Sequence, residues 1–128
     1  MIEVLVGIAI VAIALLGLAQ LFTYSVMTNS RAERMSNATF LAQQQIDYHR
    51  NLTSDELNML TSGVNDEHLD VNLDGSYDYR RLTEIQMSGV FWIIRVLVFS
   101  AEQMAESTTD LMGDPQEYDV KAEVSTIC

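Results

Sequence analysis

The pattern of apolar and polar positions divides the chain near residue 30. From Val4 to Ser30 no side chain is charged, and from Val4 to Ala19 nearly every residue is apolar. A membrane-spanning helix needs about 20 apolar residues, and this run reaches that length when it is extended through Phe22. Residues 1–50 contain no proline, so the pattern predicts one helix from Ile2 to Arg50.

The predicted helix changes character in its second half. Apolar residues recur there at spacings of three and four, which makes one apolar stripe on an otherwise polar helix. The stripe consists of Met35, Ala38, Leu41, Ala42 and Ile46. The whole helix would be about 75 Å long, which is more than a small head can cover. We therefore expect the first half to be buried by lipid or by other copies of the chain.

The last third of the sequence predicts β-structure. Residues 79–86 fit a first strand. Residues 90–99 are nearly all apolar, β-branched or aromatic, which favours a central strand buried on both faces, with Trp92 and Phe91 in the core. Residues 118–126 alternate between apolar and polar positions, as in a strand with one buried face.

The segments between these elements are polar. Residues 66–78 and 101–117 read as acidic, turn-rich loops, and a capping box at Thr53 and Glu56 predicts a short helix before them. The predicted fold class is α+β: a long N-terminal helix packed by its C-terminal half on a small antiparallel sheet. Residues 1–30 would form a membrane or core helix, and residues 31–128 a globular head.

The charge balance excludes one class of partner. The chain has 18 acidic and 7 basic residues, a net charge of −11. Nucleic acid binding is not expected, because phosphates need Lys and Arg. We find no catalytic constellation and do not expect an enzyme. His49 and His68 lack the spacing of a metal pair and read as surface residues, and the lone Cys128 is either a free thiol or a cross-link to a partner.

The opening Met1-Ile2-Glu3-Val4-Leu5 and the apolar helix after it resemble the N-termini of type IV pilins and type II secretion pseudopilins. Three features depart from that family: two residues rather than four precede the glutamate, Gln20 stands near the usual mid-helix proline, and a second cysteine is missing. No basic residue precedes the apolar run, so we expect a short basic leader to have been removed.

The resemblance implies the pilin fold and a structural role in a type IV pilus-like helical filament made of many copies. It implies storage in the bacterial inner membrane and then a place in an extracellular filament at the cell surface. The implied partners are an inner-membrane assembly platform, an assembly ATPase and a prepilin peptidase. Two alternatives stay open within the family, a type II secretion pseudopilin and a minor pilin. A third is a single-pass membrane-anchored calcium-binding domain that never polymerises.

Three residues of the apolar helix are candidate assembly residues. A carboxylate costs about 2.5–3.5 kcal/mol at the centre of a membrane helix and must find a partner. The resemblance implies that Glu3 pairs with the N-terminal amine of a neighbouring subunit. The alternative is a favourable interaction of Glu3 with the helix dipole. Gly7 and Gly17 would let helices approach closely in an apolar medium.

The acidic segment before the first predicted strand contains a candidate calcium site. Its oxygen-bearing side chains stand at alternate positions, with Gly75 at the turn, as calcium loops require. They are Asp70, Asn72, Asp74, Ser76 and Asp78. An EF-hand has a bidentate glutamate at its twelfth position, whereas this chain has Arg81, so Glu84 or Asp66 would complete the shell. The alternative is a turn of Asp, Asn and Gly without metal.

Overall fold

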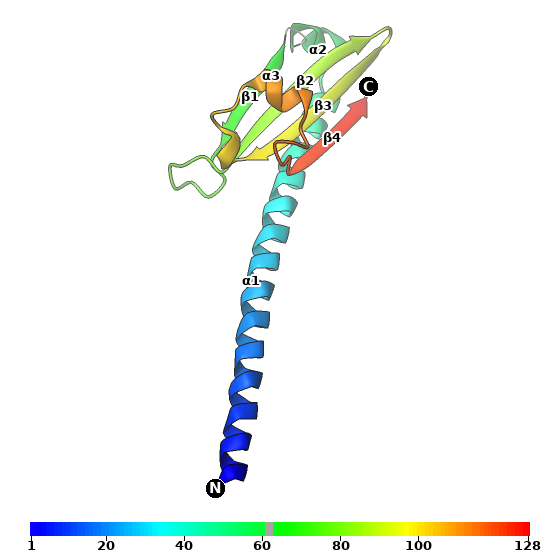
Figure 1. The fold of residues 1–128 in the computed structure, drawn as a ribbon. Coiled ribbons are helices and arrows are strands. Elements are labelled where there is room, and N and C mark those ends of the chain that lie inside the picture. The colour runs from blue at the N-terminus through cyan, green and yellow to red at the C-terminus, as the bar shows by residue number, and fades with distance from the viewer. Residues whose placement is uncertain (61–62) are drawn as a thin grey trace. The chain divides into compact units, whose positions relative to one another are not determined.

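The computed structural model describes residues 1–60 and 63–128 (Figure 1). Its helices are α1 (Ile2–Arg50), α2 (Ser54–Leu60), the 3-10 turn η1 (Ala101–Gln103) and α3 (Thr108–Gly113). Its strands are β1 (Val64–Leu69), β2 (Tyr79–Ser88), β3 (Phe91–Ser100) and β4 (Ala122–Ile127). The chain forms two compact units, Met1–Arg34 and Met35–Cys128. We call the second unit the head.

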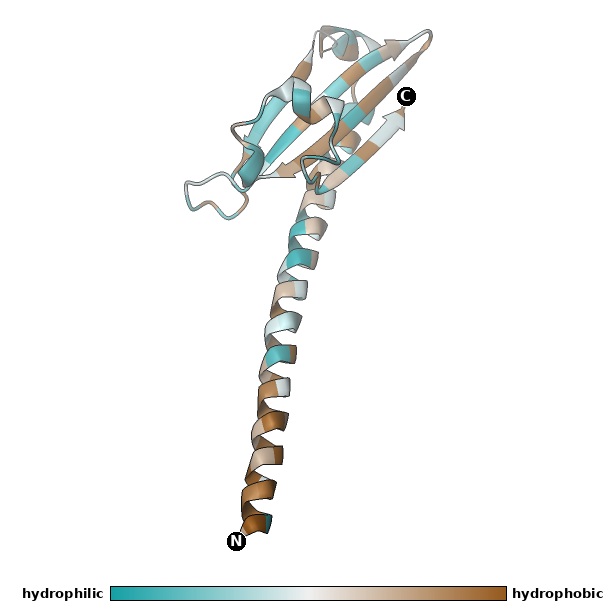
Figure 2. Ribbon diagram, in the orientation of Figure 1, coloured by the Kyte–Doolittle hydropathy of each residue, from teal (hydrophilic) through white to brown (hydrophobic). Residues whose placement is uncertain are grey.

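The first unit is the N-terminal part of α1. Its N-terminal turns are coloured mainly as hydrophobic, and hydrophilic colours become frequent further along the helix (Figure 2). All of its large apolar side chains are exposed. The helix is continuous through Gly7 and Gly17, as the absence of proline predicts.

The head is built on a four-stranded antiparallel sheet in the order β1-β2-β3-β4. Strands β2 and β3 were predicted within two residues at each end. Strand β3 lies at the centre and is buried on both faces, which confirms the prediction from its continuous apolar run. Trp92 is buried as expected, whereas Phe91 is exposed at the end of the strand.

One face of the sheet packs on the C-terminal half of α1. Ala38, Ala42 and Ile46 are buried there against residues of β2, β3 and β4. The strand residues of this core are Tyr79, Ile85, Trp92, Ile94, Val96, Val98 and Ala122. The small alanine side chains bring the helix close to the sheet, and the α+β arrangement predicted from the apolar stripe is confirmed. Met35, predicted to belong to the stripe, is exposed.

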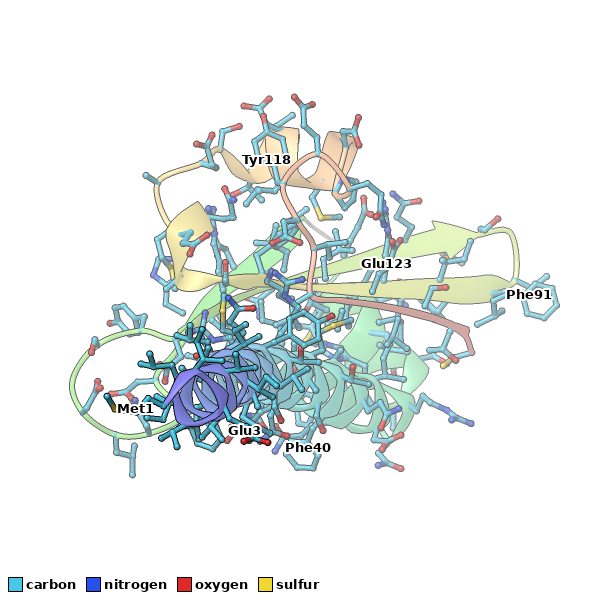
Figure 3. All side chains as sticks on the ribbon, turned by 60° about the horizontal axis from the view of Figure 1, so that its bottom comes forward. Met1, Glu3, Phe40, Phe91, Tyr118 and Glu123 are labelled. Atoms are coloured by element: carbon cyan, nitrogen blue, oxygen red, sulfur yellow. The ribbon has the colours of Figure 1, made fainter. Side chains whose placement is uncertain are left out.

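The connection from β3 to β4 covers the opposite face of the sheet. Leu111 of α3 is fully buried against Leu82, Leu97 and Phe99. Figure 3 shows this connection, marked by Tyr118, on the side of the sheet away from α1. The prediction of an acidic loop for residues 101–117 was therefore wrong, because this segment contains η1 and α3 and places Leu111 and Met112 in a second core.

Strand β4 begins at Ala122 rather than at Tyr118. Asp119 has a φ of 52°, in the left-handed region, and interrupts the extended conformation. Tyr118 and Val120 consequently pack in the core beneath α3, whereas Ala122 and Val124 pack on the α1 side. The alternation in the sequence does not mark a single strand face, because the chain passes from one face of the sheet to the other at this point.

The capping box before α2 is confirmed. The backbone amide of Thr53 donates to the Glu56 carboxylate at 2.8 Å, and the amide of Glu56 donates back to the Thr53 hydroxyl at 3.4 Å. The Thr53 bonds hold the pKa of Glu56 below its usual value. Helix α2 begins directly after the capping residue Thr53, as the sequence predicts. It packs on the head core through Leu57, which is buried.

Candidate functional site

The predicted assembly residues lie on the first unit. Glu3 is in the first turn of α1, between exposed Ile2 and Val4. A Cβ added at Gly7 or Gly17 would meet no atom within 4 Å, so packing within the chain does not require either glycine.

The apolar part of α1 is long and apolar enough to cross a membrane. Its isoleucine, leucine and valine side chains are more than half exposed on every side of the helix, with Ile13 at 70% and Val26 at 53%. Burying one such side chain contributes about 1.5–3 kcal/mol. A helix with this surface is stable only where lipid or protein covers it.

The predicted calcium residues lie together in the loop between β1 and β2. The two carboxylate oxygens of Asp70 accept the amides of Leu73 at 2.7 Å and Gly75 at 2.9 Å. The carboxylate of Asp78 accepts the amide of Val71 at 2.9 Å from the other end of the loop. The loop is therefore tied by its own carboxylates, as in the turn interpretation.

The middle of this loop is also ordered by side-chain hydrogen bonds. Asp74 accepts the hydroxyl and the backbone amide of Ser76, and the amide nitrogen of Asn72 at 3.0 Å. These bonds, chiefly that from the Ser76 hydroxyl, hold the pKa of Asp74 below its usual value. Gly75 has a φ of 90°, which explains glycine at the sharp turn. Within residues 1–60 and 63–128, no three His, Cys, Asp or Glu side chains are gathered closely enough to hold a metal ion.

Sequence analysis missed the ion pairs that fix β1. Arg80 of β2 is 4% exposed and donates to both carboxylate oxygens of Asp66, at 3.0 and 2.7 Å. It also donates to the carbonyls of Gln103 and Glu106 and to the Thr108 hydroxyl. The hydrogen bonds from Arg80 hold the pKa of Asp66 below its usual value, against the opposing effect of burial.

The neighbouring Arg81 forms a corresponding ion pair with β1 on the other face of the sheet. Its guanidinium donates to Glu67 at 2.9 and 2.5 Å and to the backbone carbonyl of Leu41 in α1 at 3.3 Å. Arg80 therefore ties the β3–β4 connection to the sheet, and Arg81 ties α1 to it. Adjacent basic residues on opposite faces of a strand are the sequence signal that could have indicated these contacts.

The two histidines have different environments. His49 is 3% exposed, and its Nδ1 donates to the carbonyl of Gln45 at 2.8 Å, so the expectation of a surface residue was wrong. His68 remains partly exposed near Asp66. Cys128 is exposed and free. None of these residues forms a site with the candidate assembly or calcium residues.

Comparison with known proteins does not add a functional assignment. No family model, no curated protein and no solved structure matches the chain. The fold, a long apolar N-terminal helix with a small antiparallel sheet, is consistent with the pilin resemblance noted in the sequence.

Proposed function

We propose that the protein is a structural subunit of a type IV pilus-like filament and polymerises through the apolar part of α1. The observation that supports this most strongly is an exposed, membrane-length apolar helix carried by a small, highly acidic head. The apolar surface must be shielded from water both before and after assembly. Lipid provides it before assembly, and sister helices provide it in the filament, where helix burial drives polymerisation.

The proposed role of Glu3 is to set the axial position of each subunit. Its carboxylate lies within an apolar helix surface, so a positive group of a neighbouring copy must pair with it when that surface is buried. The resemblance implies that this group is the N-terminal amine. The partners implied by the resemblance, a membrane platform, an ATPase and a prepilin peptidase, belong to the same proposal, as does location at the bacterial surface.

The substitution Glu3→Gln tests this function. The variant is expected to insert into the membrane normally, while the yield of sheared filaments falls by at least about tenfold, because the partner charge is left buried and unpaired. Filament yield is measured by immunoblotting the sheared and the membrane fractions. Glu33→Gln is the matched control, since Glu33 lies on the same helix beyond the uncharged run. Equal yields from the two variants would contradict the proposal.

The alternatives predict other results. A type II secretion pseudopilin or a minor pilin would share the dependence on Glu3 but give short or sparse filaments. A membrane-anchored domain that does not polymerise would give single copies in detergent, with or without Glu3. The fraction of protein released by shearing therefore separates these functions.

We also propose that the loop from Asp70 to Asp78 binds Ca²⁺. Its side-chain oxygens alternate along the chain, and Gly75 makes the required turn. A carboxylate oxygen that accepts one amide retains a second lone pair for a cation. Asp70, Asn72, Asp74, Ser76 and Asp78 would supply these oxygens, and the metal would stiffen the loop.

A further inference from the structure

Two surfaces of the head lack charge although the chain carries a net charge of −11. The two longest uncharged runs beyond residue 30 are 35–46 in α1 and 85–94 at the β2–β3 hairpin. Each run contributes side chains to the core and also an exposed apolar surface. The centres of protein interfaces are depleted in charged residues and enriched in aromatic residues and methionine.

The first surface is the side of α1 that faces away from the sheet. Ala38 and Ala42 are buried against the sheet, whereas Phe40 is 65% exposed and points to the other side (Figure 3). Of the other exposed residues in this run, Met35 is apolar, and five are polar and uncharged: Ser36, Asn37, Thr39, Gln43 and Gln44. An exposed aromatic ring among amide and hydroxyl groups is a suitable contact for another protein, and the folding of the head does not account for it.

The second surface is the tip of the β2–β3 hairpin. Ser88 pairs with Phe91, so Gly89 and Val90 form a two-residue turn, and Gly89 has the positive φ of 67° that such a turn needs at its first position. Val90 is 87% exposed, Met87 61% and Phe91 59%. Figure 3 shows Phe91 at the far end of the hairpin. The backbone at Val90 would accept a polar side chain equally well, so the turn itself does not require an apolar residue there.

The side of the head away from α1 is unsuitable for contact between copies. Burial, together with the surrounding carboxylates, raises the pKa of Tyr118 on that side. The carboxylates are Asp110, Glu117, Glu106 and Asp114. Placing this surface against an equally acidic copy would bring like charges together, whereas the two uncharged surfaces meet without that repulsion.

We propose that, in the assembled filament, the α1 surface around Phe40 of one copy packs against the hairpin tip (Met87, Val90 and Phe91) of a second copy. This inference rests on the proposed function. An open helical polymer needs contacts between two different surfaces of each subunit, since a surface that pairs with itself closes a dimer. The head provides two such surfaces, each matched to the other in its lack of charge and its apolar centre.

Cross-linking between single cysteines tests this contact. Phe40→Cys and Val90→Cys are introduced together in a full-length Cys128→Ser chain, which removes the natural exposed thiol. Both positions are exposed, so the substitutions leave the core intact. Treatment of sheared filaments with a short bifunctional maleimide is expected to produce a ladder of multimers on denaturing gels. Each cysteine alone is expected to give monomers.

The matched control joins Phe40→Cys with Gln116→Cys, an exposed position in the β3–β4 connection, and is expected to give no ladder. Dimers from either single variant would overturn the proposed pairing, because they indicate a surface that meets itself. Filaments without a ladder from the 40/90 pair would overturn the contact while leaving the filament function intact. Absence of filaments from the unsubstituted chain as well as from the Cys128→Ser parent would overturn both.

Discussion

Arg80 makes as many hydrogen bonds as a guanidinium can donate. Its five N–H groups have five acceptors, two on Asp66, two backbone carbonyls of the β3–β4 connection, and the Thr108 hydroxyl. Losing Arg80 removes five hydrogen bonds made by a buried guanidinium, whereas the Asp66 side chain is 31% exposed and stays accessible to water. One side chain therefore joins β1, β2 and the segment that covers the sheet.

Replacing Arg80 by methionine, which retains an apolar stem, is expected to lower the free energy of unfolding of the head by about 2 kcal/mol, because hydrogen bonds of a buried cation are lost while Asp66 stays partly solvated. Urea unfolding of the full-length chain in detergent, followed by tryptophan fluorescence of Trp92, measures the change. Arg95→Met is the control, because Arg95 makes an ion pair with Glu123 at 3.0 Å in which both side chains are about a third exposed. Such pairs contribute about 1 kcal/mol or less. Equal losses in the two variants would show that Arg80 has no special role.

Single residues were the hardest part of the molecule to predict from the sequence. His49 and Gln45 lie on the sheet side of α1 and are buried, although both side chains are polar. Both continue the three- and four-residue spacing of Ala38, Ala42 and Ile46, so the helix period places them on the buried face although their polar side chains do not indicate burial. Phe40 has the opposite outcome, an aromatic residue that lies outside the predicted apolar stripe of α1 and is exposed.

At the level of elements, strand β1 shows why sequence analysis missed part of the sheet. Its residues are mostly polar, and the apolar alternation that marks a half-buried strand is weak. Besides the partly buried Val64 and Leu69, the strand is held by ion pairs to β2, Asp66 to Arg80 and Glu67 to Arg81. Strands β2 and β3 could be predicted because their side chains form both cores.

The loop between β1 and β2 allows a direct test of calcium binding. Titration calorimetry of the full-length chain is expected to show one site with a dissociation constant of about 10⁻⁴–10⁻³ M, as in extracellular calcium modules. Asp74→Asn is expected to weaken binding by at least about tenfold, since it removes a ligand charge. Asp55→Asn, in α2, is the control for the loss of one acidic charge. If no heat of binding is measured at millimolar Ca²⁺, the calcium proposal is contradicted and the loop is only a hydrogen-bonded turn.

The whole molecule has two units with different solvation needs. The apolar, uncharged run predicts a change near residue 30, and the contacts of the chain divide it into units between Arg34 and Met35. The head satisfies its own apolar surface with two cores, one on each side of the sheet. The first unit has no internal core, because a single helix that is apolar on all sides has nothing of its own to pack against.

The central claim is that copies of the first unit cover one another in a helical array. Electron cryomicroscopy of the full-length chain after detergent removal tests it most directly, because the arrangement of the α1 helices would be visible in the map. We predict fibres of uniform width whose axis is a bundle of α1 helices, with the acidic side of each head facing solvent. Particles that contain a single copy, each with its apolar helix still held in detergent or lipid, would contradict the account.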